Sequence, residues 1–258
     1  MRLMKRILSA AAVLALSASL LVGCSSGTAS SVPVSASSAA ESTVSSVEET
    51  ASSAVDENEA AAAQLLNDLT GSYQELWPVI LADEYKQTWL DDCTALVGED
   101  NAEAAFEKLS SMVTGDVYGE DAVKAYANGG RAYFCGFTNS LAILTFDGET
   151  STISGTDKDG NVLFSHTYHY IGMEPVRGLY EFQSDDADSG EFTYFFLAPD
   201  TSAETYHIEF RYGSDAEALS QYDTGEYAYW QASGISTDCD QTMIDNCIEL
   251  FCTENLAG

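Results

Sequence analysis

Residues 141–171, LAILTFDGETSTISGTDKDGNVLFSHTYHYI, contain three β-strand patterns separated by two tight-turn dipeptides. The dipeptides Asp147-Gly148 and Asp159-Gly160 are typical of the short turns that join hairpin strands. The runs between them are rich in β-branched and aromatic residues, which favour strands; they are Leu141–Phe146, Thr150–Gly155 and Val162–Ile171. Since strands joined by such turns pair antiparallel, this stretch predicts an antiparallel meander.

Further runs of the same kind extend the meander on both sides. They are Tyr133–Phe137, Gly178–Gln183, Phe192–Leu197 and Thr205–Tyr212. About seven short strands in meander order predict a mainly β domain, built as an antiparallel barrel or sandwich.

Helical patterns lie before and after the strands. Apolar residues at helical spacing predict three helices ahead of the strands, over Glu59–Asp68, Tyr85–Leu96 and Ala102–Met112. After the strands, Ser214 and Glu217 form a capping-box pattern, and Asp238–Thr253 has one apolar helical stripe. We therefore expect helices on both sides of the β region in the chain.

The first 24 residues have the layout of a bacterial lipoprotein leader. Three basic residues precede a short apolar run. That run ends in Leu21-Val22-Gly23-Cys24, which resembles a lipobox. The resemblance implies cleavage of a signal peptide over residues 1–23, lipidation of Cys24, and anchoring at the extracytoplasmic face of the cell membrane through lipid only. An ordinary secretory leader or an uncleaved apolar helix is the alternative.

Residues 24–61 are rich in Ser and Ala and contain no aromatic side chain. Such a composition cannot bury enough apolar surface to offset chain entropy, so we predict a disordered stalk behind the lipid. Residues 62–258 then have a length that suits one folded domain.

The chain is strongly acidic, with 10 basic and 41 acidic residues. Removal of residues 1–23 takes away three basic residues and no acidic ones, which leaves 7 against 41 and a net charge of −34. This charge repels nucleic acid, and it raises the local concentration of cations. We exclude nucleic acid as a partner; a cationic ligand is favoured, although acidity also serves solubility.

Several motifs resemble, in chain order, those of the ZinT (YodA) domain family, which also occurs in AdcA-type zinc-binding lipoproteins. They are Gly71–Pro78, Val176–Phe182, Ala198-Pro199, Tyr206–Phe210 and Gly213–Leu219. The resemblance implies a calycin-type, lipocalin-like barrel with flanking helices. It also implies a surface protein that gathers zinc, or another divalent metal, for an uptake transporter of the ABC class.

The resemblance also indicates where a metal would bind. Three histidines hold zinc in the family, and their positions here are Phe195, Thr205 and His207. Strand alternation places Glu209 on the face of His207, while a slip of one residue would bring in Glu204 instead.

Two more histidines, His166 and His169, lie three apart and would point to opposite faces of a strand, so at most one of them joins His207. We favour His169 and predict a zinc site of His207, His169 and Glu209. The alternative is that these are strand histidines satisfied by ordinary hydrogen bonds.

The sequence contains no catalytic motif that we recognise, such as a nucleophile elbow, a paired-histidine zinc motif or a phosphate loop, and we expect no enzyme. Two functions besides metal binding stay open. One is a metal-free barrel that binds a small apolar or sugar-like ligand in its mouth. The other is a non-catalytic surface interaction module.

Five cysteines follow Cys24, namely Cys93, Cys135, Cys239, Cys247 and Cys252. The last three fall at unsuitable spacings for bonds within one helix. A bond from one of them to Cys93 or Cys135 stays open, as do free buried thiols and a Cys/His metal cluster.

Replacement of Cys24 by Ala tests the anchor. Without the thiol no diacylglycerol can be attached, so the Cys24→Ala protein is expected in the medium rather than in the membrane fraction. Cell fractionation with immunoblotting measures this distribution. A variant that stays with the membranes after a high-salt wash contradicts the lipobox.

Overall fold

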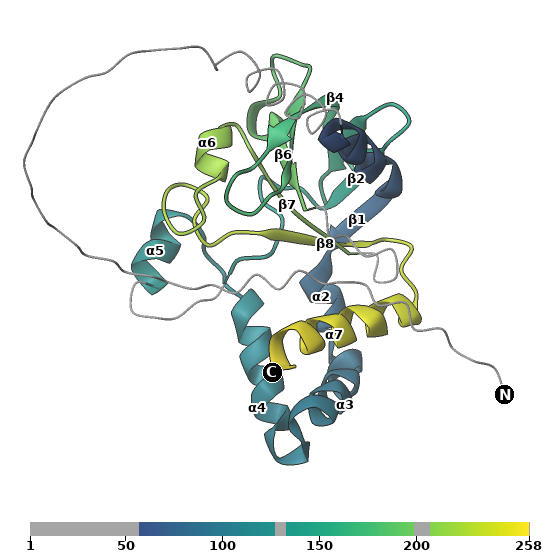
Figure 1. Cartoon of the computed structure of the whole chain (residues 1–258), viewed down its shortest axis with the longest axis vertical. Coiled ribbons are helices and arrows are strands. Elements are labelled where there is room, and N and C mark those ends of the chain that lie inside the picture. Colours follow the sequence, from purple (N-terminus) through teal and green to yellow (C-terminus); the bar gives the residue numbers. More distant parts are fainter. Residues whose placement is uncertain (1–56, 127–132, 199–206, 258) are drawn as a thin grey trace, which may run out of the picture. The chain divides into compact units, whose positions relative to one another are not determined.

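Eight β-strands close into an antiparallel barrel in this computed structural model, which describes residues 57–126, 133–198 and 207–257 (Figure 1). The strands are β1 (Gly71–Glu75), β2 (Ile143–Asp147), β3 (Thr152–Thr156), β4 (Val162–Met173), β5 (Tyr180–Ser184), β6 (Tyr194–Leu197), β7 (His207–Gly213) and β8 (Ala232–Ser236). Each strand pairs antiparallel with its neighbour in the chain, and β1 pairs with β8 to close the ring. The predicted antiparallel, lipocalin-like barrel is confirmed.

The hairpin pattern located the middle strands well. Strands β2 to β4 follow the three runs of the 141–171 stretch, with the two turns between them. Strands β5, β6 and β7 also match predicted runs, although β6 begins only after a short 3-10 turn, η2 (Gly190–Phe192). The closing strands β1 and β8 were not predicted.

The strand predicted over Tyr133–Phe137 was wrong. This segment forms only an isolated bridge at Phe134, which pairs with Thr114 and Trp230. Its backbone groups have scattered partners: Phe134 N–H donates to the carbonyl of Tyr229, Phe137 N–H donates to Glu75 Oε1 at 2.5 Å, and the carbonyl of Cys135 accepts from Ser233 N–H of β8. The aromatic run thus packs beside the barrel without forming a further strand of its sheet.

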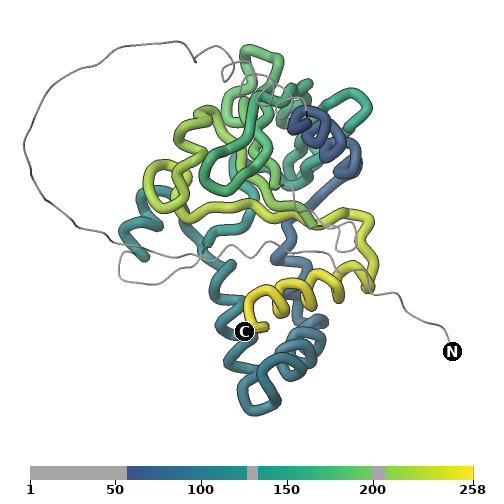
Figure 2. The backbone as a smooth tube through the Cα atoms, in the orientation of Figure 1, coloured from purple at the N-terminus to yellow at the C-terminus, as the bar shows by residue number. Residues whose placement is uncertain are grey.

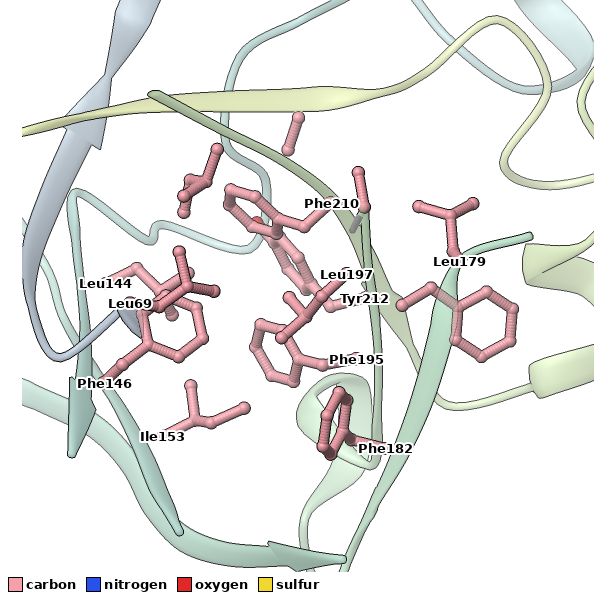
Figure 3. Packing of buried hydrophobic residues seen from close by; sticks show 14 of the residues in the cluster. Leu69, Leu144, Phe146, Ile153, Leu179, Phe182, Phe195, Leu197, Phe210 and Tyr212 are labelled. Atoms are coloured by element: carbon pink, nitrogen blue, oxygen red, sulfur yellow. The ribbon is translucent and has the colours of Figure 1, made fainter. Parts of the chain in front are cut away.

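Aromatic side chains fill the barrel. Phe195 of β6 and Tyr212 of β7 stack with ring centroids 5.4 Å apart, and Phe210 stacks on Tyr212 at 5.8 Å. All three are fully buried (Figure 3). Gly155 of β3 makes room for this packing, because a Cβ there would lie 2.4 Å from the ring of Phe164.

A second apolar cluster lies outside the barrel, between its wall and a group of helices. The helices are α2 (Leu76–Ile80), α3 (Lys86–Val97), α4 (Glu99–Val113) and α7 (Gln241–Leu256), with the turn η1 (Asp83–Tyr85) before α3. The tube in Figure 2 shows α7 beside α3 and α4, although α7 lies far from both of them in the chain. In this cluster Trp77 and Trp89 both meet the ring of Phe251, at 4.8 and 6.0 Å.

The remaining helices are short. Residues 57–68 form a helix whose buried leucines join the barrel cluster, as predicted from residue 59 onward. Helix α5 (Glu120–Tyr126) and helix α6 (Ala216–Leu219) complete the set. The predicted N-cap of α6, Ser214, was wrong by one residue. Asp215 is the N-cap, and its side chain accepts hydrogen bonds from the N–H groups of Glu217 and Ala218.

Within the described ranges, no helix has the length and apolar character needed to span a lipid bilayer. The predicted leader, Cys24 and most of the predicted stalk lie outside these ranges.

Truncation of Phe195 tests the role of the aromatic filling. Phe195→Ala leaves a cavity inside the barrel, which is expected to lower the free energy of unfolding by about 3–5 kcal/mol. Urea unfolding followed by tryptophan fluorescence measures this loss. Val176→Ala, at a position 61% exposed, is the control and is expected to change stability by less than about 0.5 kcal/mol. Equal effects of the two changes would contradict the assigned core.

Candidate functional site

His207 and Glu209 lie on the outer face of the barrel wall. The alternation of β7 puts Ile208, Phe210 and Tyr212 in the buried barrel cluster, so the intervening side chains point the other way. The sequence predicts that His207 and Glu209 share a face of the strand. In the structure this shared face meets α2 and α7.

Both side chains line a small pocket of about 40 Å³ between β7 and these two helices. Helix α7 adds two further polar side chains to its lining, Cys247 and Glu254. Apolar residues complete the pocket: Leu76, Trp77, Ile80, Leu250 and Phe251. A space of this size holds an ion with a water molecule, but no larger organic ligand.

The polar lining is the donor chemistry that divalent transition metals prefer. Zinc binds imidazole nitrogen, thiolate sulfur and carboxylate oxygen at about 2.0–2.3 Å. In the conformation shown, the described residues contain no group of three or more His, Cys, Asp or Glu side chains arranged to hold an ion. A closed shell at this pocket therefore requires side-chain rotation.

Sequence reasoning missed the two α7 members of the pocket. Cys247 lies within the predicted last helix without any link to His207 in the sequence, and Glu254 falls just beyond the predicted end of that helix. No sequence signal links them to β7, because only the packing of α7 against the barrel brings them there.

His169 does not line this pocket. It lies on β4, about half exposed, and its Nδ1 is 2.6 Å from Oδ1 of Asp185. Strands β5 and β6 separate β4 from β7, and through their register His169 lies level with Gly213, six residues along β7 from His207. The displacement along β7 alone is roughly 20 Å. The structure therefore brings together His207 and Glu209 but not His169.

His166 is also held by a carboxylate. Its Nδ1 lies 2.7 Å from Oδ2 of Asp186, and its ring stacks near Phe164 with centroids 5.9 Å apart. Each of the two β4 histidines thus has a carboxylate as its hydrogen-bond partner.

One other position of the predicted family pattern lies in the described residues, and it does not join His207. Phe195 lies inside the barrel, on the opposite side of the wall from His207. Thr205 and Glu204 lie outside the described residues. The ring of Phe195 therefore supplies no ligand to an ion at the outer pocket.

Arg211, the next outward residue of β7, is fully buried at the far end of the same strand. Its guanidinium donates to the carbonyls of Leu219 and Tyr227 and lies 4.4 Å from the ring centroid of Tyr222. Burial lowers the pKa of Arg211 to about 10, so it stays charged at neutral pH. This arginine fastens the α6 region to the barrel and is not available to a ligand.

Three carboxylates lie close together between α3 and α7, outside the lining of the pocket. Burial raises the pKa of Asp92 on α3, and the α7 carboxylates of Glu249 and Asp245 raise it further.

Cys135 lies near Glu209 but does not line the pocket. Burial raises the pKa of the Cys135 thiol to about 12, and the negative charge of Glu209 adds to the effect. In the metal-free protein the Cys135 thiol therefore stays protonated at neutral pH.

The structure is a closed antiparallel barrel with a small pocket, lined by His207 and Glu209, on its outer wall. No family model matches the chain, and no curated protein matches it. Among solved structures it is similar to the zinc-bound ZinT-like domain of Streptococcus pneumoniae AdcA, at 16% identity and a TM-score of 0.45, over 71% of this chain and 89% of that one. It is also similar to zinc-bound AdcA from the same organism, at 15% identity and a TM-score of 0.41, over 72% of this chain and 35% of that one.

Alkylation of the folded protein tests the protonated state of Cys135. With a pKa near 12, only about one molecule in ten thousand carries the thiolate at pH 8. Iodoacetamide is therefore expected to leave Cys135 unmodified while it labels the half-buried Cys239, as peptide mass spectrometry would show. Labelling of Cys135 as fast as of Cys239 would contradict the assigned environment.

Proposed function

We propose that this chain is a lipid-anchored protein of the extracytoplasmic membrane face that binds a divalent metal ion, zinc first among them, and supplies it to a metal uptake transporter. The observation that supports metal binding most directly is the pocket in which His207 and Glu209 of β7 face Cys247 and Glu254 of α7. The leader pattern supports the location, and the net charge of the chain supports a cationic cargo.

Each pocket residue has a distinct part in this proposal. His207 supplies a neutral imidazole nitrogen from a strand whose backbone is fixed on both sides by β6 and β8. Glu209 and Glu254 supply negative charge to neutralise the ion, and Cys247 supplies a sulfur that loses its proton on binding. Because ligands have to be deprotonated, affinity falls as the pH drops into the acidic range.

The filled barrel favours this site over a ligand in the barrel mouth. Calycin-type ligand sites need an open interior, whereas Phe195, Phe210 and Tyr212 occupy the interior here. Binding at the outer wall needs no change in this core.

Zinc titration by calorimetry tests the proposal on residues 24–258 with Cys24→Ser. His207→Ala is expected to weaken zinc binding at least tenfold, about 1.4 kcal/mol, because it removes the imidazole nitrogen and leaves three of the four proposed protein ligands. Glu209→Ala is expected to act in the same direction with a smaller effect. Circular dichroism checks that each variant stays folded.

His169→Ala is the matched control, since it also removes a strand histidine but lies away from the pocket. It is expected to leave zinc affinity unchanged. A loss in His169→Ala equal to that in His207→Ala would restore the set of three residues predicted from sequence. A parent protein that binds no zinc would refute the proposal and favour a surface interaction module.

A further inference from the structure

Two buried cysteines meet where the helices outside the barrel pack together. Cys93 of α3 and Cys252 of α7 are both completely buried, and their sulfurs lie 3.9 Å apart. The two residues are 159 positions apart in the chain. No local sequence feature therefore brings them together, and their contact results from the tertiary packing.

Large side chains on the same two helices hold the cysteines in this position. Trp89, one turn before Cys93, meets Phe251, the neighbour of Cys252, with ring centroids 6.0 Å apart. The indole N–H of Trp89 donates to the carbonyl of Ile80 at 2.7 Å, which fixes the ring in the cluster. The sulfurs thus face each other across a well-packed interface rather than at a mobile surface.

We propose that Cys93 and Cys252 form a disulfide bond that joins α3 to α7 in the mature protein. A disulfide has its sulfurs about 2.05 Å apart, so the two side chains need to close by less than 2 Å from their present contact. Rotation about the side-chain bonds brings thiols at such a distance together. The proposal rests on a location outside the membrane, where disulfides persist, and does not depend on metal binding.

The bond forms by exchange with the disulfide of a thiol-disulfide oxidoreductase or of oxidised glutathione. One cysteine thiolate attacks a sulfur of that disulfide, which gives a mixed disulfide and releases the other sulfur as a thiolate. The second cysteine then attacks the mixed disulfide and releases the remaining sulfur. The oxidant gains two electrons and the two protons of the cysteines, and becomes two thiols.

The timing of this exchange follows from the burial of the pair. Burial raises the pKa of both thiols, and each sulfur is closed to solvent once α3 and α7 have packed. The exchange therefore takes place while the helices are still assembling. The finished bond is then protected from reductants by the same packing.

The bond would restrain nearly the whole barrel. Strands β2 to β8 all lie in the segment between the two cysteines, so the cross-link closes a long loop in the unfolded chain. Loops of this length give large entropic stabilisation, and for a domain of this size the melting temperature is expected to rise by on the order of 10 °C.

Mass spectrometry of residues 24–258 with Cys24→Ser tests the bond directly. The protein is refolded in oxidised and reduced glutathione with EDTA present, so that no metal masks a thiol, then denatured without reductant and treated with N-ethylmaleimide. We expect three adducts and a peptide that links Cys93 to Cys252. Five adducts, or a link between any other pair, would overturn the proposal.

Thermal unfolding gives a second, independent measurement. Each protein is unfolded and refolded with or without dithiothreitol before it is melted. The reduced samples of the parent and of a Cys239→Ala control are expected to melt at a lower temperature than the oxidised ones, whereas Cys93→Ala and Cys252→Ala are expected to show no difference. A reductant effect that survives in Cys93→Ala would also overturn the proposal. If either core variant fails to fold, the adduct count of the parent still decides the question.

Discussion

The stacking of Phe195, Phe210 and Tyr212 inside the barrel is the contact on which the rest of the structure depends. Rings from neighbouring strands fill the interior, so β6 and β7 have to present these residues inward. Because side chains alternate along a strand, this choice also fixes the residues that face outward. The location of His207 and Glu209 on the outer wall is therefore a consequence of core packing, and a shift of one residue in β7 would exchange the two faces.

The polar residues of the outer pocket come from a strand and from a helix. The polar residues on β7 belong to a strand with partners on both sides, whereas Cys247 and Glu254 belong to a helix that packs against the barrel wall. In the metal site proposed above, the strand would be the fixed half and the helix the adjustable half. A shell that closes by movement of one half binds its ion less tightly, and releases it more readily, than a shell that is complete beforehand.

The sequence predicts the middle of this barrel well and its seam poorly. The strands of the 141–171 stretch are marked by turn dipeptides and β-branched residues, which act locally. Strands β1 and β8 are short and contain small or polar residues, such as Ser72 and Gly234, so their strand state depends on pairing with β2 and β7 and with each other. The same division applies to the site. Alternation along β7 predicts that His207 and Glu209 share a face, whereas the α7 residues beside them, and the separation of His169, depend on contacts between distant segments.

Closure of the barrel joins its first strand to its last, with Tyr73 opposite Ser236. A chain that is made from its N-terminus cannot form this seam until the residues of β8 have emerged. Until then β1 exposes one unpaired edge, with free backbone N–H and C=O groups that can pair with another chain. Folding of this domain is thus a late and all-or-none event in synthesis. A chain that stops before residue 236 would have an open sheet with an aggregation-prone edge rather than a smaller barrel.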